Sequence, residues 1–301
     1  MNYIPGFDSL TRKDNLLAIL EPMVKTQKES KVKLIIPETH YLRSAKDWEA
    51  LSKTVKDEEE IYFMKEVQKT KGSSNSVLVY DLQKHSVMKS KATTHVADEK
   101  LTIVQRFLQD SLTINKYKHD LRCFVQIVSV DPLVVIFSKG YAKRSSLEFD
   151  LSKKLHKMAF STNFEDQILH HQFDEIKNEL TANVSILESA IKDAVDLDTF
   201  WTQIKSAIKT VLQTWHQSLE QRLASTFTLA VFDFIICKQG QEIYLDSVSS
   251  YNHLPASTVL LKDLNKQQAQ SFLKNVMLMN EKFIERHSQT ALESLSGERI
   301  I

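Results

Sequence analysis

Glycine is scarce in this chain, and the scarcity excludes the common nucleotide-binding loops. Five glycines occur in 301 residues, well below the roughly 7% that is average for proteins. They stand apart from one another, so the sequence contains neither GxGxxG nor GxxxxGK[ST]. Both loops need clustered glycines because their backbone N–H groups must closely approach phosphate. If this chain binds a nucleotide, it must therefore hold it mainly with side chains.

Cysteines, long apolar runs and net charge are also low. Cys123 and Cys237 lie in apolar strand-like runs, which favours small buried thiols over a disulfide or a metal pair. The longest apolar runs, 133–137 and 229–237, are far too short to span a bilayer. The first residues lack the apolar core of a signal peptide, and a net charge of +1 does not suggest nucleic-acid binding. We expect a cytoplasmic protein without nucleic-acid partners or membrane insertion.

Apolar spacing predicts a mixture of strands and helices. We expect strands at residues 32–36, 61–65, 76–82, 121–130, 133–141, 227–237 and 242–248. We expect helices at residues 12–27, 44–56, most of 165–223, and 265–287. The clearest helix carries an apolar stripe from Trp201 to Leu219, for which core packing is the simplest explanation, with Asp198 as its N-cap. Thr11 is the expected N-cap of the first helix. The mixture indicates an α+β or α/β protein with more than one lobe.

Several separated segments resemble one known family in that family's order. They are NYIPG (2–6), LTRKD (10–14), YFMK (62–65), VQRFL (104–108), KHDLR (118–122), PL (132–133), YAKRSS (141–146), STN (161–163), FDF (232–234) and YLD (244–246). Each string alone is weakly specific, but their shared order argues against chance. On these motifs the chain resembles the tubulin–tyrosine ligase family over about residues 1–285.

The resemblance implies a mixed α/β fold of the ATP-grasp ligase type, with a flexible tail after the catalytic domain. The implied parts are a catalytic domain at 1–285, its N-terminal lobe at 1–58, central lobe at 59–108, C-terminal lobe at 109–285 with a helical insertion at about 165–223, and a tail at 286–301.

The resemblance also implies a reaction and its participants. In this family ATP phosphorylates a carboxylate, and the amine of a second amino acid attacks the acylphosphate to form an amide or isopeptide bond. The cofactors would be ATP and Mg²⁺. The substrates would be free tyrosine, glutamate or glycine and the acidic tail of tubulin or of another protein. Microtubules and cilia are the implied locations within the cytoplasm.

A lysine and a four-residue linker are among the positions that the resemblance assigns to the nucleotide. Lys65, on an expected strand, would place its ammonium over the phosphates, although a surface lysine on an edge strand is the alternative. Gln105, Arg106, Phe107 and Leu108 would form the linker where adenine binds, through backbone groups and the two apolar side chains. The alternative for this linker is an ordinary core strand.

Lys118, Asp120 and Arg122 alternate along an expected strand, so their side chains should face the same way. A charged row of this kind is unusual on a structural strand unless it faces a polar cleft. By resemblance, Lys118 and Asp120 would bind the nucleotide and Arg122 would be catalytic.

Lys143 stands where the family has an arginine, which keeps the charge but loses the bidentate fork. By resemblance Lys143 would be catalytic together with Arg122. It would also face the incoming amino acid and the acceptor, together with Thr162 and Asn163.

Asp233 and Asp246 fall on neighbouring expected strands, where their carboxylates could converge on Mg²⁺. Asp233 lies between two phenylalanines and therefore needs a partner or a cation to offset its desolvation. The chain also departs from the family pattern, because Asp246 replaces a longer glutamate and Phe160 a histidine. The family's asparagine falls on Val248 if no gap is allowed, or on Ser249 after a one-residue insertion. These changes keep open a pseudoenzyme that binds nucleotide or acidic tails without ligation. A third possibility, an unrelated helical scaffold, requires every match to be chance.

Overall fold

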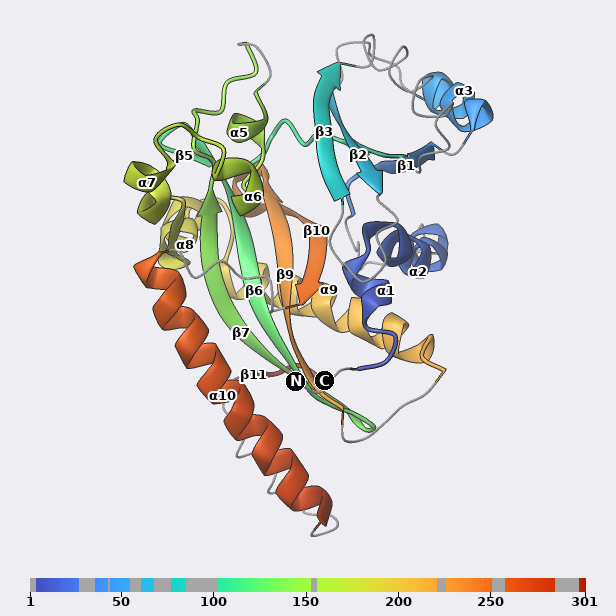
Figure 1. Ribbon diagram of the computed structural model, residues 1–301, viewed down its shortest axis with the longest axis vertical. Coiled ribbons are helices and arrows are strands. Elements are labelled where there is room, and N and C mark those ends of the chain that lie inside the picture. Colours follow the sequence, from blue (N-terminus) through green and yellow to red (C-terminus); the bar gives the residue numbers. More distant parts are fainter. Residues whose placement is uncertain are drawn as a thin grey trace.

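The computed structural model places two antiparallel sheets and the helices around them (Figure 1). The residues that it describes are 4–26, 36–42, 44–54, 61–67, 77–84, 102–152, 156–220, 226–250, 258–284 and 298–301.

The elements alternate between strands and helices along the chain. The helical elements are α1 (Asp8–Thr11), α2 (Lys13–Thr26), α3 (Ala45–Thr54), α5 (Lys157–Phe160), α6 (Phe164–Gln167), α7 (Phe173–Ile176), η2 (Lys177–Glu179), α8 (Ser185–Ile191), α9 (Leu197–Gln217), η3 (Lys238–Gly240) and α10 (Val259–Ile284). The strands are β1 (Thr39–Leu42), β2 (Ile61–Val67), β3 (Val77–Lys84), β4 (Thr102–Arg106), β5 (Thr113–Ile114), β6 (Tyr117–Val130), β7 (Leu133–Arg144), β8 (Thr181–Asn183), β9 (Thr228–Cys237), β10 (Glu242–Ser250) and β11 (Glu298–Arg299). No helix in the described ranges is long and apolar enough to cross a lipid bilayer.

The smaller sheet has the strand order β1-β4-β2-β3, and all its pairings are antiparallel. Trp48 and Leu51 of α3 pack with Leu42, Tyr62 and Val104 in a small core on this sheet. Strand β1 lies before the lobe boundary expected at residue 58, yet it pairs with β4 beyond that boundary. The expected N-terminal and central lobes therefore share one sheet, and the lobe division stays a prediction.

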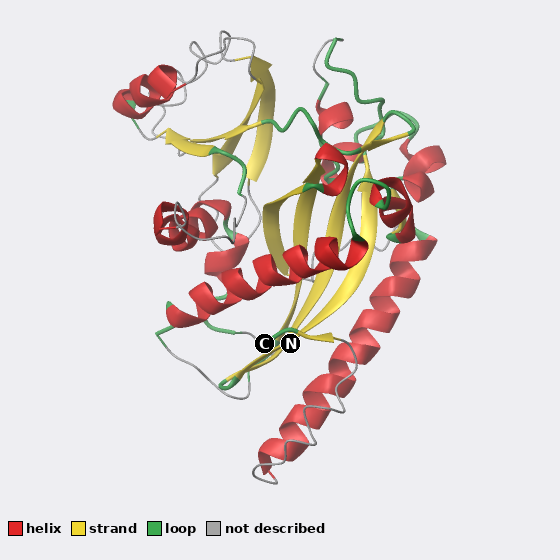
Figure 2. Cartoon of the chain, turned by 180° about the vertical axis from the view of Figure 1, so that it is seen from behind, coloured by secondary structure: helices red, strands yellow, loops and turns green. Residues whose placement is uncertain are grey.

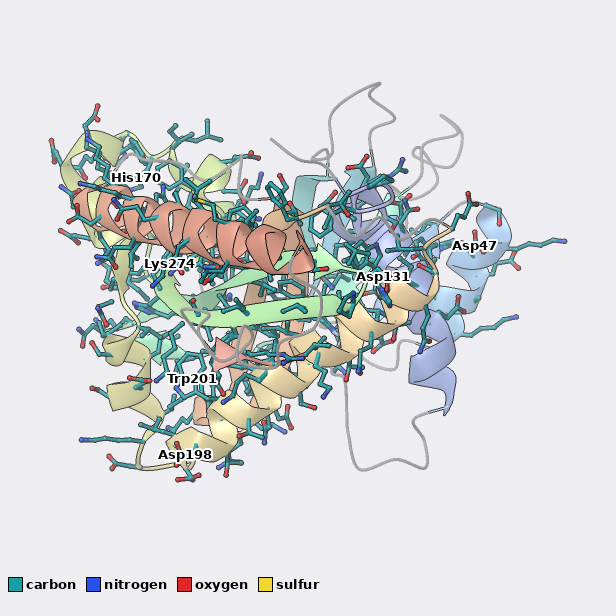
Figure 3. All side chains as sticks on the ribbon, turned by 90° about the horizontal axis from the view of Figure 1, so that it is seen from below. Asp47, Asp131, His170, Asp198, Trp201 and Lys274 are labelled. Carbon is teal, nitrogen blue, oxygen red and sulfur yellow. The ribbon has the colours of Figure 1, made fainter. Side chains whose placement is uncertain are left out.

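The larger sheet has seven strands in the order β10-β9-β6-β7-β11, with β5 paired to β6 and β8 paired to β7. Helix α9 crosses one face of this sheet (Figure 2), and α10 runs along the other, so that the central strands lie between the two helices (Figure 3). Val125 and Ile127 of β6 belong to the main core with α9. Val128 of β6 packs instead with Val276 of α10. Alternate side chains of β6 therefore pack on opposite faces of the sheet, as expected for a strand covered on each side.

Helix α9 confirms the predicted apolar stripe from Trp201 to Trp215, whereas Leu219 lies beyond the end of the helix and is half-buried. Its buried residues are Phe200, Trp201, Ile204, Ile208, Val211, Leu212 and Trp215. The predicted N-cap is wrong, because Asp196 rather than Asp198 caps the helix. The backbone of Asp196 is extended, and its carboxylate accepts the Thr199 backbone N–H at 2.8 Å. Asp198 already lies in the first turn of the helix.

The chain's first helix also begins differently from the prediction. Thr11 is the last residue of α1 and not an N-cap, since Arg12 is extended and separates α1 from α2. Of the strand expected at 32–36, only Ile36 lies within the described residues, and it is not in a strand. Strand β1 follows it and was not predicted.

Residues at the far end of the chain are held on the larger sheet. We expected 286–301 to be a flexible tail, but β11 pairs with β7 near Ile136 and Phe137. The Ile300 N–H donates to the Val135 carbonyl at 3.0 Å. The prediction of a flexible tail is therefore wrong for residues 298–301, because their backbone pairs with β7 at the edge of the larger sheet.

The insertion expected to be helical over 165–223 is broken by a strand. Strand β8 pairs with β7, with Asn183 opposite Tyr141 and Thr181 opposite Lys143. Short helical segments lie before β8, and the long α9 comes later. This pairing fixes the insertion beside Lys143, one of the predicted site residues.

The two cysteines behave as the sequence predicts. Cys123 and Cys237 are free and buried. Burial raises the pKa of both thiols, to about 12 for Cys237. Neither thiol is therefore suited to act as a nucleophile at neutral pH.

Truncating Trp215 to alanine should destabilise the fold, because this side chain joins α9 to the start of the chain. Trp215 is fully buried, packs edge-on against Phe7 and donates its indole N–H to the Gly6 carbonyl at 3.1 Å. Losses for buried Trp→Ala changes are about 3–5 kcal/mol, measurable by urea unfolding. The exposed Gln213→Ala on the same helix should change stability by less than about 0.5 kcal/mol. Equal losses for both variants would contradict the assigned packing.

Candidate functional site

A narrow cleft, partly open to solvent, lies where strands of both sheets meet the segment that follows α5. Strands β2, β4, β6, β9 and β10 all contribute to its lining. Predicted site residues that line it are Gln105, Arg106, Phe107, Leu108, Lys118, Asp120, Thr162, Asn163 and Asp246. The structure therefore brings together residues that are distant in sequence.

A second, smaller hollow adjoins the cleft. Arg122 and Lys143 line it, together with Tyr141 and with Leu261 of α10. Thr162 lines both spaces. Arg122 and Lys143 thus face the hollow, the described residues expected to bind nucleotide face the cleft, and Thr162 borders both spaces. Asn163, which is expected to bind substrate, lines only the cleft.

Lys118 and Asp120 form a buried ion pair on β6, beside Thr162. The Lys118 ammonium contacts Asp120 Oδ1, and the Thr162 hydroxyl donates to Asp120 Oδ2 at 2.6 Å. The Lys118 backbone N–H donates to the Ser145 hydroxyl at 3.0 Å. An ammonium carries three N–H donors, so Lys118 can hold Asp120 and still donate to an anion in the cleft.

Arg122 and Asp233 form a second buried ion pair, deeper in the larger sheet. They lie directly opposite each other on β6 and β9. Arg122 Nε donates to Asp233 Oδ1 at 2.7 Å, and Nη2 donates to Oδ2 at 2.6 Å. Lys143 Nζ lies 3.0 Å from the same Oδ2, and the Ser247 hydroxyl donates to it at 3.3 Å. Both carboxylate oxygens of Asp233 therefore accept from cationic side chains.

The charge state of this cluster follows from its surroundings. Burial alone would raise the pKa of Asp233, but Arg122 and Lys143 outweigh burial and lower it to about 2. Burial would likewise lower the pKa of Arg122, but Asp233 and Tyr141 raise it above its ordinary value. Asp233 and Arg122 are thus both ionised at neutral pH despite being buried.

Gly140 lets β7 approach β6 next to this cluster. A Cβ atom at position 140 would lie 1.9 Å from the Arg122 carbonyl oxygen, a distance at which no side chain fits. The register of β6 and β7 is irregular between Arg122 and Phe124. One of the few glycines is therefore needed to pack the backbone that carries Arg122.

Asp246 is held by a residue that sequence reasoning did not assign to the site. Lys13 Nζ donates to Asp246 Oδ1 at 2.8 Å, to the Asp246 carbonyl at 2.9 Å and to Gln105 Oε1 at 2.9 Å. Lys13 is itself buried and comes from the LTRKD motif, which was the one signal that could have identified it. A bulge in β10 between Leu245 and Ser247 places Asp246 out of register.

The two carboxylates do not fit a magnesium site as they are arranged. Magnesium needs several oxygen ligands in near-octahedral geometry, whereas Asp233 already accepts from Arg122 and Lys143, and Asp246 from Lys13. Within the described residues, no three His, Cys, Asp or Glu side chains are grouped so that they could hold a metal. The assignment of Mg²⁺ to Asp233 and Asp246 stays a prediction that this geometry does not support.

An aromatic wall forms the apolar side of the cleft. Phe107 packs edge-on against Phe63 and against Phe160, with 5.4 Å between ring centroids in each pair. Phe160 is the residue that stands in place of the family's histidine, and here it extends this wall. Leu108 is half-buried beside it, while Arg106 is exposed. Such a wall suits the flat face of a purine ring.

The loop after α5 is held by polar contacts that no sequence motif predicts. Gln167 Nε2 donates to the Ser161 carbonyl at 2.6 Å, and its Oε1 accepts the Ser146 backbone N–H at 2.7 Å. The Ser161 hydroxyl donates to Asp166 at 2.5 Å. These bonds hold Ser161 in place directly before Thr162, whose hydroxyl donates to Asp120.

Two further predicted residues lie at the margin of the described site. Lys65 is on β2 opposite Ile103 of β4, but its side chain lies outside the described part of the chain, so its role stays a prediction. Asn163 is exposed at the rim of the cleft, and its backbone N–H donates to the Ser161 hydroxyl at 3.1 Å.

Comparison with known proteins agrees with the motifs. The sequence model of the tubulin-tyrosine ligase family matches residues 1–283. A search against curated proteins found no match. Membership of this family suggests an ATP-dependent ligase that acts on a protein substrate.

Replacing Asp233 with asparagine should destabilise the protein strongly at neutral pH, because Arg122 would remain buried and charged without its partner. Breaking such a pair costs about 3–5 kcal/mol. The pKa of Asp233 is lowered from 3.8 to about 2, so its contribution is complete above pH 3.8 and is lost as pH falls toward 2.

Urea unfolding of wild type and Asp233→Asn at pH 7, 5, 4 and 3 checks this prediction. The difference in free energy of unfolding should be constant from pH 7 to 5 and smaller at pH 3. The exposed Asp193→Asn should stay within about 0.5 kcal/mol of wild type. A difference that grows at low pH would refute the ion pair.

Proposed function

Because the chain belongs to the tubulin-tyrosine ligase family, we propose that it is an ATP-dependent ligase that joins an amino acid to a protein acceptor. The amino acid is tyrosine, glutamate or glycine, and the acceptor is the acidic tail of tubulin or of a similar protein. The single observation that carries the proposal is the row of cationic side chains along the cleft and the adjoining hollow. The protein would act in the cytoplasm, at microtubules or cilia.

The nucleotide would bind in the larger cleft, with its base on the aromatic wall. Phe107 and Leu108 offer apolar surface there, and Lys118 lies on the same cleft. Lys118 is buried and held by Asp120, so its ammonium is already placed for a phosphate oxygen. Lys65 on β2 would add a second positive charge. Side chains would thus do what glycine-rich loops do elsewhere with backbone N–H groups.

The proposed reaction has two steps, and this chain's residues would position and neutralise the reacting groups. A carboxylate oxygen of one substrate attacks the γ-phosphorus of ATP, and ADP leaves. The amine of the second substrate then attacks the acyl carbon, and phosphate leaves as the amide forms. Arg122 and Lys143 supply positive charge beside the developing anions, in a buried setting where such charge is most effective.

The amino acid and the acceptor would meet in the smaller hollow. Lys143 and Arg122 line it, and Thr162 connects it to the nucleotide cleft. A substrate carboxylate there would lie against two cations and next to the proposed γ-phosphate position. Asn163, exposed at the cleft rim, could donate to the same substrate.

A second candidate function is favoured by one specific feature of the cluster. Arg122 and Lys143 already contact Asp233, and Lys13 already contacts Asp246. Cations engaged in this way are less available to developing negative charge. The alternative is therefore a protein that binds nucleotide or an acidic tail without ligation.

One assay separates the two candidates. The purified chain is incubated with ATP, tubulin and one isotope-labelled amino acid at a time. ADP release and labelled tubulin peptides are then measured by chromatography and mass spectrometry. Amide product formed together with ADP supports the ligase. ATP binding without product for tyrosine, glutamate and glycine contradicts the ligase and supports the alternative.

Replacing Lys118 with methionine should weaken ATP binding at least about tenfold, because a charge-assisted hydrogen bond contributes about 1.5–3 kcal/mol. Calorimetric titration with ATP measures the effect, and a thermal melt shows that the variant folds. Lys116→Met is the matched control, since Lys116 is exposed and contacts Glu148 only at 3.8 Å. Equal ATP affinities for Lys118→Met and wild type would exclude Lys118 from the nucleotide site.

A further inference from the structure

Among the described residues, four cations and three carboxylates form ion pairs with one another at and directly behind the two adjoining spaces. Each carboxylate contacts at least one cation. The cations are Lys13, Lys118, Arg122 and Lys143, and the carboxylates are Asp120, Asp233 and Asp246. The cluster therefore has a formal charge of +1 and neutralises its own acidic groups.

We propose that Asp233 and Asp246 are positioning residues that hold Arg122, Lys143 and Lys13 in place, and that ATP binds here without a divalent cation on these carboxylates. The inference rests on the proposed nucleotide site but not on turnover. In this proposal the two aspartates are counter-ions of the neighbouring cations and not ligands of a metal.

Asp233 shows the reason most clearly. Its side chain is only 4% exposed, and it accepts both arms of the Arg122 fork. A metal ion on Asp233 would have to displace Arg122 or Lys143. Either cation would then remain in a buried setting without its partner, which is strongly unfavourable. The cross-strand register of Arg122 and Asp233 makes the displacement harder still, because both backbones are fixed by sheet hydrogen bonds.

Asp246 leads to the same conclusion by a different geometry. Lys13 contacts its carboxylate and its backbone carbonyl at once, and it also holds Gln105 of the smaller sheet. A metal at Asp246 would break a contact that ties α2, β4 and β10 together. Lys13 therefore acts as the cation of this position and connects the two sheets across the cleft.

The charge balance has a consequence for the ligand. An excess positive charge favours the more negative form of a triphosphate, so free ATP should bind at least as well as its magnesium complex. A site built on metal-bridging carboxylates behaves in the opposite way, because its acidic groups repel the phosphates until a cation neutralises them.

Calorimetric titration of the full chain with ATP, once with excess EDTA and once with excess Mg²⁺, tests the inference. Binding in EDTA should be at least as tight as in Mg²⁺, and a dissociation constant up to about threefold larger, a difference of about 0.6 kcal/mol, counts as equal. Weaker binding than that in EDTA would overturn the inference and leave the proposed nucleotide site standing. An absence of binding in both buffers would overturn both.

Variants of the two carboxylates make the test sharper. Asp233→Asn and Asp246→Asn should weaken ATP binding by the same factor in EDTA and in Mg²⁺, since they disturb cations and not a metal. A loss confined to Mg²⁺ would identify a metal ligand and refute the proposal. Asp246→Asn keeps the test valid if Asp233→Asn does not fold, because Asp246 is 20% exposed. The exposed Asp110→Asn is the matched control and should match wild type in both buffers.

Discussion

The ion pair between Arg122 and Asp233 joins two adjacent strands in the middle of the larger sheet, and the rest of the site is arranged around it. Both groups are buried and ionised, so neither can be left alone without a large loss of stability. Lys143 reaches the same carboxylate from β7. Gly140 allows the close approach of β7 that this arrangement needs. The pair thus fixes the position of the cations that would meet the substrate.

A chain with few glycines that binds a nucleotide would have to hold the phosphates mainly with side chains. Lys118 is buried and held by Asp120, which in turn accepts from Thr162. Each carboxylate at the site orders a cation instead of standing free. Lys13 extends this pattern from one sheet to the other through Gln105. The family commonly uses ATP and magnesium, but among the described residues of this site cationic side chains outnumber the carboxylates that could bind a metal.

The sequence predicted much of the fold, but not the contacts that decide the chemistry. Apolar periodicity located the long strands and α9, and alternation placed Lys118, Asp120 and Arg122 in one row. It could not predict strand register, so the pairing of Arg122 with Asp233 was not foreseen. The contact of Lys13 with Asp246 joins residues 233 positions apart and depends on a β-bulge, which no local pattern reveals. Short segments such as β1 and β8 were missed because pairing rather than propensity forms them.

In the proposed function, the cleft between the two sheets binds ATP through these cationic side chains. Hydrogen exchange of the full chain, with and without saturating ATP, tests it most directly. We predict slower exchange in peptides that cover residues 102–111 and 156–164, which line the cleft, and unchanged exchange in α9, which lies on the opposite face of the larger sheet. Unchanged exchange at both cleft segments, with protection only elsewhere, would show that ATP does not bind in this cleft.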